Sequence, residues 1–178
     1  MSKILAVSGS PRKGNTEFMM NAVLDEITDH EKELILLRNK NFGHCIGCLT
    51  CHNTIKCIID DDMQEINKKL SESDIIILGT PNYFDNVSGL MKDFLDRTHP
   101  FYKSEGLKGK KLYLLAVGGG SEENHKQPIV DVIESFADLQ KLDLIDSLWI
   151  RALQKDEAEK QEQAINKLKE FGQKINSL

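Results

Sequence analysis

The sequence has no apolar run of the length that a membrane-spanning helix needs, about 20 consecutive residues. A membrane-embedded protein is therefore not expected. Its N-terminus, MSKILAVSGS, lacks the charged and apolar regions of a signal peptide and begins a strand pattern at once, which predicts a cytoplasmic protein. Net positive charge is also absent, because the formal net charge is −5. We accordingly expect no nucleic-acid partner, since such partners call for a basic face.

Internal repeats, low-complexity tracts and linkers are missing as well. A chain of 178 residues with this pattern is expected to form one domain spanning residues 1–178. With 40% hydrophobic and 29% charged residues, its composition is that of a globular protein and not of a disordered one. Cysteine is scarce: the chain has four, all between residues 45 and 57. Cytoplasmic thiols stay reduced, so this clustering points to metal or redox chemistry and not to disulfides.

What the chain does have is a regular alternation of strand and helix patterns. Apolar stripes at helical spacing occur within residues 20–27, 63–70, 90–95, 129–136 and 164–175. A succession of β–α units predicts a doubly wound α/β fold, with a parallel sheet covered by helices on both faces. The predicted strands are Lys3–Ser8, Glu33–Arg38, Asp74–Thr80, Lys111–Val117 and Leu142–Ile150.

The segment between the first predicted strand and the first helix has the composition of a phosphate-binding loop. The N–H groups and partial positive charge at a helix N-terminus suit an anion. Arg12 would complement the phosphate charge, and Gly14 would let the backbone approach closely. Further side-chain donors are Ser8, Ser10, Asn15 and Thr16. The alternative is a polar turn with Asn15 as the N-cap. Neither the dinucleotide fingerprint nor the Walker motif is present.

Two further loops follow the third and fourth predicted strands. An isoalloxazine ring is flat, with apolar faces and polar edges, and an extended loop with aromatic side chains and free amides suits it. The first loop offers Pro81, Asn82, Tyr83, Phe84 and Asp85. Alternatively, Tyr83 and Phe84 pack in the core. The second loop begins with Gly118 and Gly119, which allow a planar ring to approach, or simply form a flexible connection.

Residues 39–59 break the alternation and form a cysteine-rich insertion loop, longer than most connections in α/β units. Their cysteines read C-x2-C-x2-C-x5-C, a spacing at which four thiolates can hold one iron–sulfur cluster. Zinc, with His44 and His52 as spare ligands, is the main inorganic alternative, and thiols without metal are another. The predicted metal ligands are Cys45, Cys48, Cys51 and Cys57.

These motifs carry a family resemblance. Residues 8–16 resemble the phosphate loop of the NADPH-dependent FMN reductases, and residues 81–97 resemble their flavin-ring loop and following helix. Residues 45–63 are similar to the compact cluster motif of the iron–sulfur flavoproteins in that superfamily. The resemblance implies a flavodoxin-like fold, with a five-stranded parallel sheet in the order 2-1-3-4-5. One departure is Asp85, where many relatives have glycine.

The resemblance also implies a function. We expect an oxidoreductase that relays electrons through FMN and a [4Fe–4S] cluster, with ferredoxin or NAD(P)H as donor, assembled as a homodimer or homotetramer. FMN is expected over FAD because one anion-binding loop is visible and nothing suggests an adenine pocket. The alternatives are an NAD(P)H-dependent FMN, quinone or azo reductase without a cluster, and a flavodoxin-type electron carrier. In each case the cofactors supply the chemistry, so no catalytic side chain is predicted.

Overall fold

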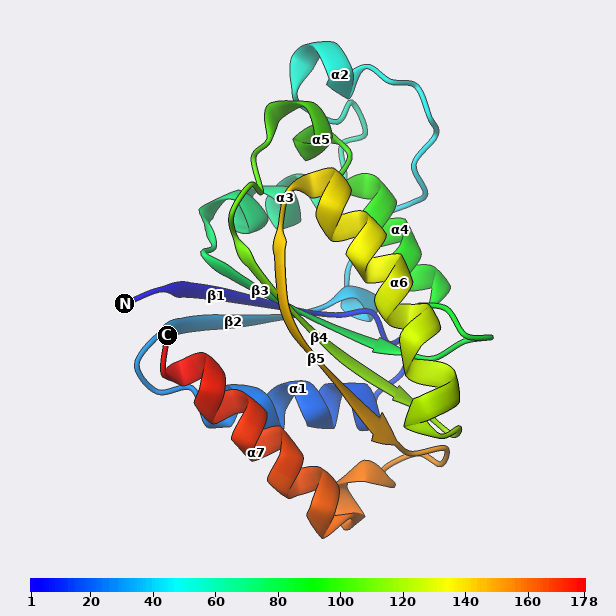
Figure 1. Ribbon diagram of the computed structural model, residues 1–178. Helices are drawn as coiled ribbons and strands as arrows, with labels where there is room; N and C mark the ends of the chain where they lie inside the picture. The colour runs from blue at the N-terminus through cyan, green and yellow to red at the C-terminus, as the bar shows by residue number, and fades with distance from the viewer.

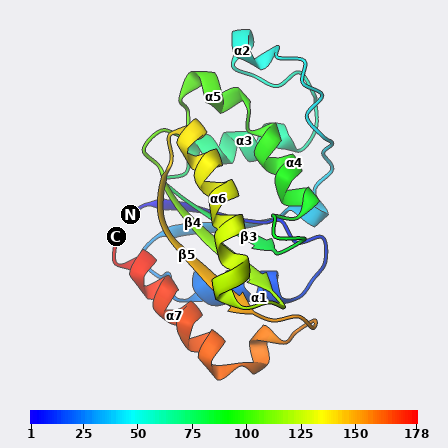
Figure 2. The ribbon, with the colours of Figure 1, turned by 45° about the vertical axis from the view of Figure 1, so that its right-hand side comes forward.

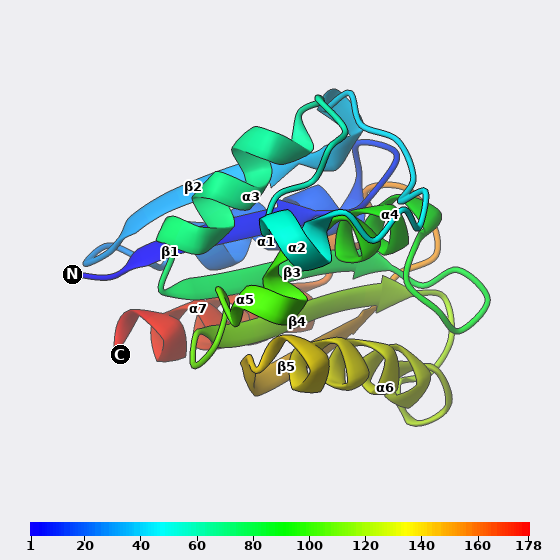
Figure 3. The same cartoon turned by 90° about the horizontal axis from the view of Figure 1, so that it is seen from above.

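The computed structural model describes residues 1–178, which contain a five-stranded parallel sheet in the order β2-β1-β3-β4-β5. Seen from above, the strands lie side by side in this order (Figure 3). The predicted doubly wound, flavodoxin-like fold and its strand order are thereby confirmed. The strands are β1 (Lys3–Ser8), β2 (Glu31–Leu36), β3 (Ile75–Pro81), β4 (Lys111–Gly118) and β5 (Asp143–Arg151).

Helices cover both faces of the sheet (Figure 1). One face carries α1 (Asn15–Asp25) and α7 (Glu162–Asn176). The other carries α3 (Met63–Glu72), α4 (Gly89–Arg97) and α6 (Glu122–Gln140). Short helical turns complete the chain: η1 (Leu37–Asn39), α2 (Cys51–Thr54), α5 (Pro100–Ser104) and η2 (Ala158–Lys160). None of the helices has both the length and the apolar character that crossing a bilayer requires.

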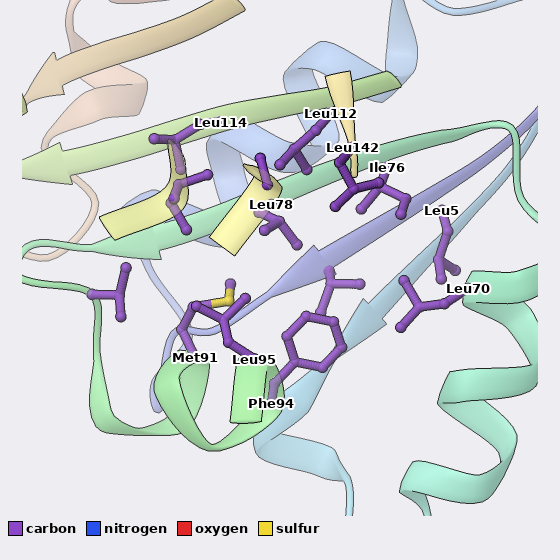
Figure 4. Packing of buried hydrophobic residues seen from close by; sticks show 14 of the residues in the cluster. Leu5, Leu70, Ile76, Leu78, Met91, Phe94, Leu95, Leu112, Leu114 and Leu142 are labelled. Atoms are coloured by element: carbon purple, nitrogen blue, oxygen red, sulfur yellow. The ribbon is translucent and has the colours of Figure 1, made fainter. Parts of the chain in front are cut away.

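Apolar runs in the sequence explain why the central strands form. The first five residues of β3 are all buried, because helices lie on both faces of the sheet. On one face, Met91, Phe94 and Leu95 of α4 pack toward the sheet residues Ile76 and Leu78 (Figure 4). Each fully buried side chain of this size stabilises the fold by roughly 1.5–3 kcal/mol relative to exposure. Such packing fixes α4 against the sheet.

The element boundaries differ from the sequence predictions at the edge of the sheet. β2 begins at Glu31, two positions before the predicted start, although its first three residues are exposed and charged. Backbone pairing with β1, from Lys3 opposite Glu31 onward, extends the strand beyond its apolar part. The predicted strand end at Arg38 lies instead in η1, where Leu37 turns into the core.

Helix α4 runs from the loop after β1 to the cysteine-containing segment. Its N-cap, Ser88, lies beside the loop after β1, because the Ser88 hydroxyl donates to the Gly9 carbonyl at 2.5 Å. Its last residue, Arg97, contacts the cysteine-containing segment. Nine helical residues span about 13 Å, so the two regions are separated by roughly that distance along α4. Figure 2 shows α2 and α5 together at one end of the molecule, away from α7.

Candidate functional site

A pocket lies where the polar loops leave the carboxyl ends of the strands. Ligands of open α/β sheets bind at this edge, beside the point where the strand order reverses. The structure brings together here every predicted cofactor residue except Ser8, Phe84 and Asp85. The lining residues are Ser10, Arg12, Gly14, Asn15, Thr16, Pro81, Asn82, Tyr83, Val117, Gly118, Gly119, Ala152 and Leu153.

The loop after β1 is shaped by close backbone packing. The Gly9 N–H donates to the Gly79 carbonyl at 2.8 Å, which continues the pairing of β1 with β3. A Cβ atom at Gly9 would lie 2.6 Å from the Cβ of Met91, so α4 can pack this closely only against glycine. Next in the loop, the Ser10 hydroxyl donates to the Arg12 carbonyl at 2.7 Å and tightens the turn. The loop therefore presents its backbone toward the pocket from a fixed position.

Helix α1 begins without a side-chain cap. Its N-cap is Gly14, and no side chain accepts from the first-turn N–H groups, which leaves the positive end of the helix open to an anion. Asn15 is the first helical residue and not the cap, so the N-cap role that the polar-turn alternative gave it is wrong. The Asn15 amide donates to the Gln154 carbonyl at 2.8 Å, and its oxygen accepts from the Ala158 N–H at 3.1 Å. This side chain ties α1 to the segment after β5.

Charged groups around the loop favour an added anion. The Arg12 side chain is exposed and makes no hydrogen bond or ion pair. Glu17, in the first turn of α1, would repel a phosphate, but it pairs with Arg38 at 2.8 Å. Arg12 therefore supplies an unpaired positive charge within the pocket lining. Ser8, at the end of β1, is fully buried and its hydroxyl has no hydrogen-bond partner.

The loop after β3 makes a tight reversal. Tyr83 and Asn86 exchange backbone hydrogen bonds of 2.9 and 3.2 Å across Phe84 and Asp85, which have φ angles of 54° and 56°. Two successive left-handed residues define a type I′ turn, which favours glycine, asparagine and aspartate. Asp85 therefore occupies a position whose backbone conformation suits aspartate and would equally suit glycine. Phe84 at the turn tip is fully exposed and lies outside the pocket.

The glycines after β4 form the opposite wall. A Cβ atom at Gly118 would lie 2.6 Å from the Cη2 atom of Trp149 and 2.9 Å from the Cβ of Asn82. Glycine at this position therefore lets β4, β5 and the loop after β3 approach one another. The Asn82 N–H donates to the Val117 carbonyl at 2.7 Å and closes the same corner. Ala152 and Leu153, which complete the wall, were not predicted, since nothing in the sequence marks two apolar residues after an edge strand as pocket residues.

The four cysteines line a second, separate cavity. All four thiols are free, and the walls include the apolar side chains of Ile46, Leu49, Ile58 and Ile59. Burial and the neighbouring thiolates of Cys57, Cys48 and Cys45 raise the pKa of the Cys51 thiol. Hydrogen bonds from Thr50 lower the pKa of the Cys48 thiol. The donor set suits a cysteine-ligated cluster.

Single-ion geometry is absent: nowhere in residues 1–178 do three His, Cys, Asp or Glu side chains stand in an arrangement that would hold one metal ion. The spare zinc ligands also lie elsewhere. The His44 ring contacts Asp93 at 2.6 Å, and the His52 ring stacks on His99 with centroids 4.8 Å apart. The four cysteine thiolates would hold a cluster of several iron atoms, which does not require the single convergent site that zinc requires.

Three further residues near the two sites were not predicted from the sequence. Arg97 donates toward the Cys57 Sγ at 3.7 Å, and the His99 ring contacts the Cys51 Sγ at 3.3 Å. His125 contacts Asp85 at 2.5 Å on the rim of the first pocket. Nothing in the local sequence marks these contacts, because they join residues 40 or more positions apart.

The strand order, with helices on both faces and a pocket at the carboxyl edge of the sheet, defines a flavodoxin-like α/β protein. Comparison with known sequences specifies the family. The model of the family described as NADPH-dependent FMN reductase matches residues 2–129. The chain belongs to this family, whose members are flavin oxidoreductases, and the resemblance found in the sequence is confirmed.

Individual relatives point to one branch of the family. An iron-sulfur flavoprotein of Methanocaldococcus jannaschii is 41% identical over 132 residues, which cover 70% of this chain and 68% of the relative. An iron-sulfur flavoprotein of Archaeoglobus fulgidus is 40% identical over 111 residues, which cover 61% of this chain and 50% of the relative. The chain thus matches about half to two thirds of the length of these relatives.

Solved structures show the same fold. A flavodoxin, WrbA-like protein from Agrobacterium tumefaciens superposes with a TM-score of 0.70 at 15% identity, covering 99% of this chain and 96% of that one. At this level of identity the likeness shows the fold alone.

Proposed function

We propose that this protein binds FMN in the pocket at the carboxyl edge of the sheet and relays electrons through it. The observation that carries the proposal is the convergence of three loops, after β1, β3 and β4, around one pocket whose helix N-terminus has no cap. Membership of the FMN reductase family supports it.

The phosphate of FMN is assigned to the start of α1. The free N–H groups of its first turn and the unpaired guanidinium of Arg12 supply positive potential, and Ser10 and Thr16 line the same wall. Asn15 contributes here through its backbone, because Gln154 and Ala158 already engage its side chain. Ser8 offers its unpartnered hydroxyl from beneath the loop.

The flavin ring is assigned to the space between the loops after β3 and β4. Pro81, Asn82 and Tyr83 would lie on one side, and Gly118 and Gly119 on the other. Bound FMN accepts one or two electrons and so links one-electron and two-electron partners. The chain's own residues bind the ring, orient it and set the polarity at its edge. Phe84 and Asp85 are assigned to the rim and not to ring contacts, because the turn directs them away from the pocket lining.

We assign a [4Fe–4S] cluster to the cysteine cavity. Four free thiols line one cavity with apolar walls, and the named relatives are iron-sulfur flavoproteins. Such a cluster transfers single electrons. The chain's contribution is four thiolates and their surroundings. On this proposal the chain is one FMN-binding domain in the cytoplasm that works as a homodimer or homotetramer and takes electrons from ferredoxin or NAD(P)H.

Purification without oxygen tests the proposal. Flavin released by heat should run as FMN on chromatography, and iron and acid-labile sulfide should each be present at about four per chain. FAD as the main flavin would refute the pocket assignment. Because an exposed cluster is open to oxygen, iron-free protein should be reconstituted anaerobically before iron content is judged.

An NAD(P)H-dependent reductase without a cluster is the second candidate, favoured by the family match over residues 2–129. The two candidates differ in their reductants. Rapid mixing without oxygen, with NADPH, NADH or reduced ferredoxin, should show which donor reduces the flavin. Fast reduction by NADPH of a protein that takes up no iron would select the second candidate.

A further inference from the structure

Arg97 is one of the most buried charged residues in the molecule, with a side chain 1% exposed. It ends α4, directly beneath the cysteine cavity. Its Nη1 and Nη2 atoms donate to the two carboxylate oxygens of Asp61 at 2.7 and 2.8 Å, a bidentate arrangement. Burial disfavours its charge, but the Asp61 carboxylate outweighs burial and raises the pKa of Arg97.

The same guanidinium bonds to both ends of the segment that contains the four cysteines, residues 44–60 (the cysteine segment). Nη1 also donates to the Gly43 carbonyl at 2.8 Å, while Asp61 lies at the other end of the segment. One side chain thus holds both ends of the segment against α4. A second link lies beside it, where Asn41 and Asp62 exchange hydrogen bonds of 2.7 and 3.2 Å. A segment whose ends are already held together loses less conformational entropy when it binds a metal, so binding costs less free energy.

Arg97 also reaches a thiol. Nη2 points toward the Cys57 Sγ at 3.7 Å, within hydrogen-bonding distance for sulfur. On the other side of the cavity, the His99 ring contacts the Cys51 Sγ at 3.3 Å and is held by stacking on His52 and Tyr102. Two of the four thiols therefore have nitrogen neighbours from the α4–α5 region.

We propose that Arg97 is a positioning residue for the metal centre, which keeps the cysteine segment closed before metal binds and directs an N–H to the thiolate of Cys57. This inference rests on the proposed cluster. A purely structural ion pair would be replaceable by apolar side chains of similar volume. If Arg97 also donates to a cysteine sulfur of the cluster, replacing the pair should change the cluster's reduction potential. A cationic donor to that sulfur stabilises the reduced, more negative state of the cluster and so raises its reduction potential.

Arg97→Gln is the test variant, and Arg97→Lys keeps the charge without the planar fork. Lys92→Gln is the matched control, because Lys92 lies on the same helix and makes only an exposed ion pair with Asp96. Arg97→Gln alone leaves Asp61 buried and unpaired, so Asp61→Asn/Arg97→Gln is made as well, which removes both charges together. An unchanged FMN dissociation constant reports that each variant is folded.

The first measurement is hydrogen exchange in the iron-free, FMN-loaded protein. The N–H groups of residues 52–55 bond within the segment and should be protected in the wild type. We expect exchange in these residues to be faster by on the order of tenfold or more in Arg97→Gln and in the double variant, and unchanged in Lys92→Gln.

The second measurement is a redox titration of the anaerobically reconstituted cluster. We expect the midpoint potential to be more negative in Arg97→Gln than in the wild type, with Arg97→Lys between the two. Wild-type exchange rates in residues 52–55 of the glutamine variants, or a wild-type potential in a fully loaded Arg97→Gln protein, would overturn the proposal. If wild-type protein takes up no iron, the proposed cluster fails and Arg97 remains only a clamp, which the exchange measurement shows independently.

Discussion

The carboxylate of Asp85 and the imidazole of His125, 40 residues apart in the chain, meet at 2.5 Å on the rim of the proposed FMN pocket. Asp85 also accepts from the Asn82 amide at 3.1 Å, and His125 lies against Gly120, where a Cβ atom would clash with its ring. The pair therefore links the turn after β3 with the glycine loop after β4. Hydrogen bonding to His125, and then to Asn82, lowers the pKa of Asp85, so this carboxylate is charged.

This contact bears on the effect of Asp85 on the flavin. A carboxylate near the ring would disfavour the anionic reduced form and lower the flavin potential. In the structure its charge is directed to His125 and not into the pocket. The sequence alone left the direction of this side chain open.

Removing the imidazole should expose the charge of Asp85. We expect His125→Ala to make the flavin midpoint potential more negative at neutral pH, by a small amount because both groups are exposed and salt screens them. The shift should disappear in Asp85→Asn/His125→Ala, where the charge is also removed. A redox titration of the three proteins checks this, and an equal shift in the double variant would refute the electrostatic explanation.

Arg12→Ala should weaken FMN binding without affecting the fold, because the Arg12 side chain has no partner in the structure. Loss of one charge-assisted contact to phosphate should cost roughly 1.5–3 kcal/mol of binding free energy. Titration of the apoprotein with FMN measures it. Lys13→Ala, the neighbouring cation outside the pocket lining, is the control and should bind normally.

Gly118→Ala should impair both the fold and the pocket. The added Cβ would lie 2.6 Å from Trp149 and 2.9 Å from Asn82, and overpacking of this kind costs about 1–3 kcal/mol of unfolding free energy. Urea denaturation and FMN titration are the measurements. Gly89→Ala, whose Cβ would meet nothing within 4 Å, is the matched control. Equal stability of the two variants would show that the corner relaxes.

Cys48→Ser should abolish the cluster while leaving FMN bound. The cysteine cavity and the proposed FMN pocket share no lining residue, and α4 separates them. After anaerobic reconstitution, we expect loss of iron and sulfide and of the broad cluster absorption, with the flavin bands intact. Retention of about four irons per chain would remove Cys48 from the ligand set.

Asp61 should contribute stability that depends on pH. Burial alone would raise its pKa, but the hydrogen bonds and charge of Arg97 outweigh burial and hold it below the ordinary value of 3.8. The contribution is therefore fully present above that value and is lost as pH falls through the lower pKa of the folded state. Asp61→Ala should lose about 3–5 kcal/mol at neutral pH, because it leaves Arg97 buried without a partner. The urea midpoints of the wild type and of Asp61→Ala, measured from pH 7 down to acid pH, should converge as the pH falls.

Local sequence was sufficient to predict the fold class and to locate the candidate binding loops along the chain. Continuous apolar runs mark the buried strands, and periodic apolar residues mark α3, α4 and α7, because each pattern follows from which faces are covered. The glycine-containing loop before α1 and the spacing of the cysteines are likewise visible in the chain itself. Each of these features depends on neighbours within a few residues.

Tertiary structure decided how those loops are used. The Asn15 side chain is engaged by Gln154 and Ala158 and is not free for a phosphate. Arg97 meets Asp61 and Cys57 only because α4 packs beneath the cysteine segment. These contacts join residues 36 or more positions apart, and they form when the sheet and its helices pack, a step that no local pattern in the sequence encodes.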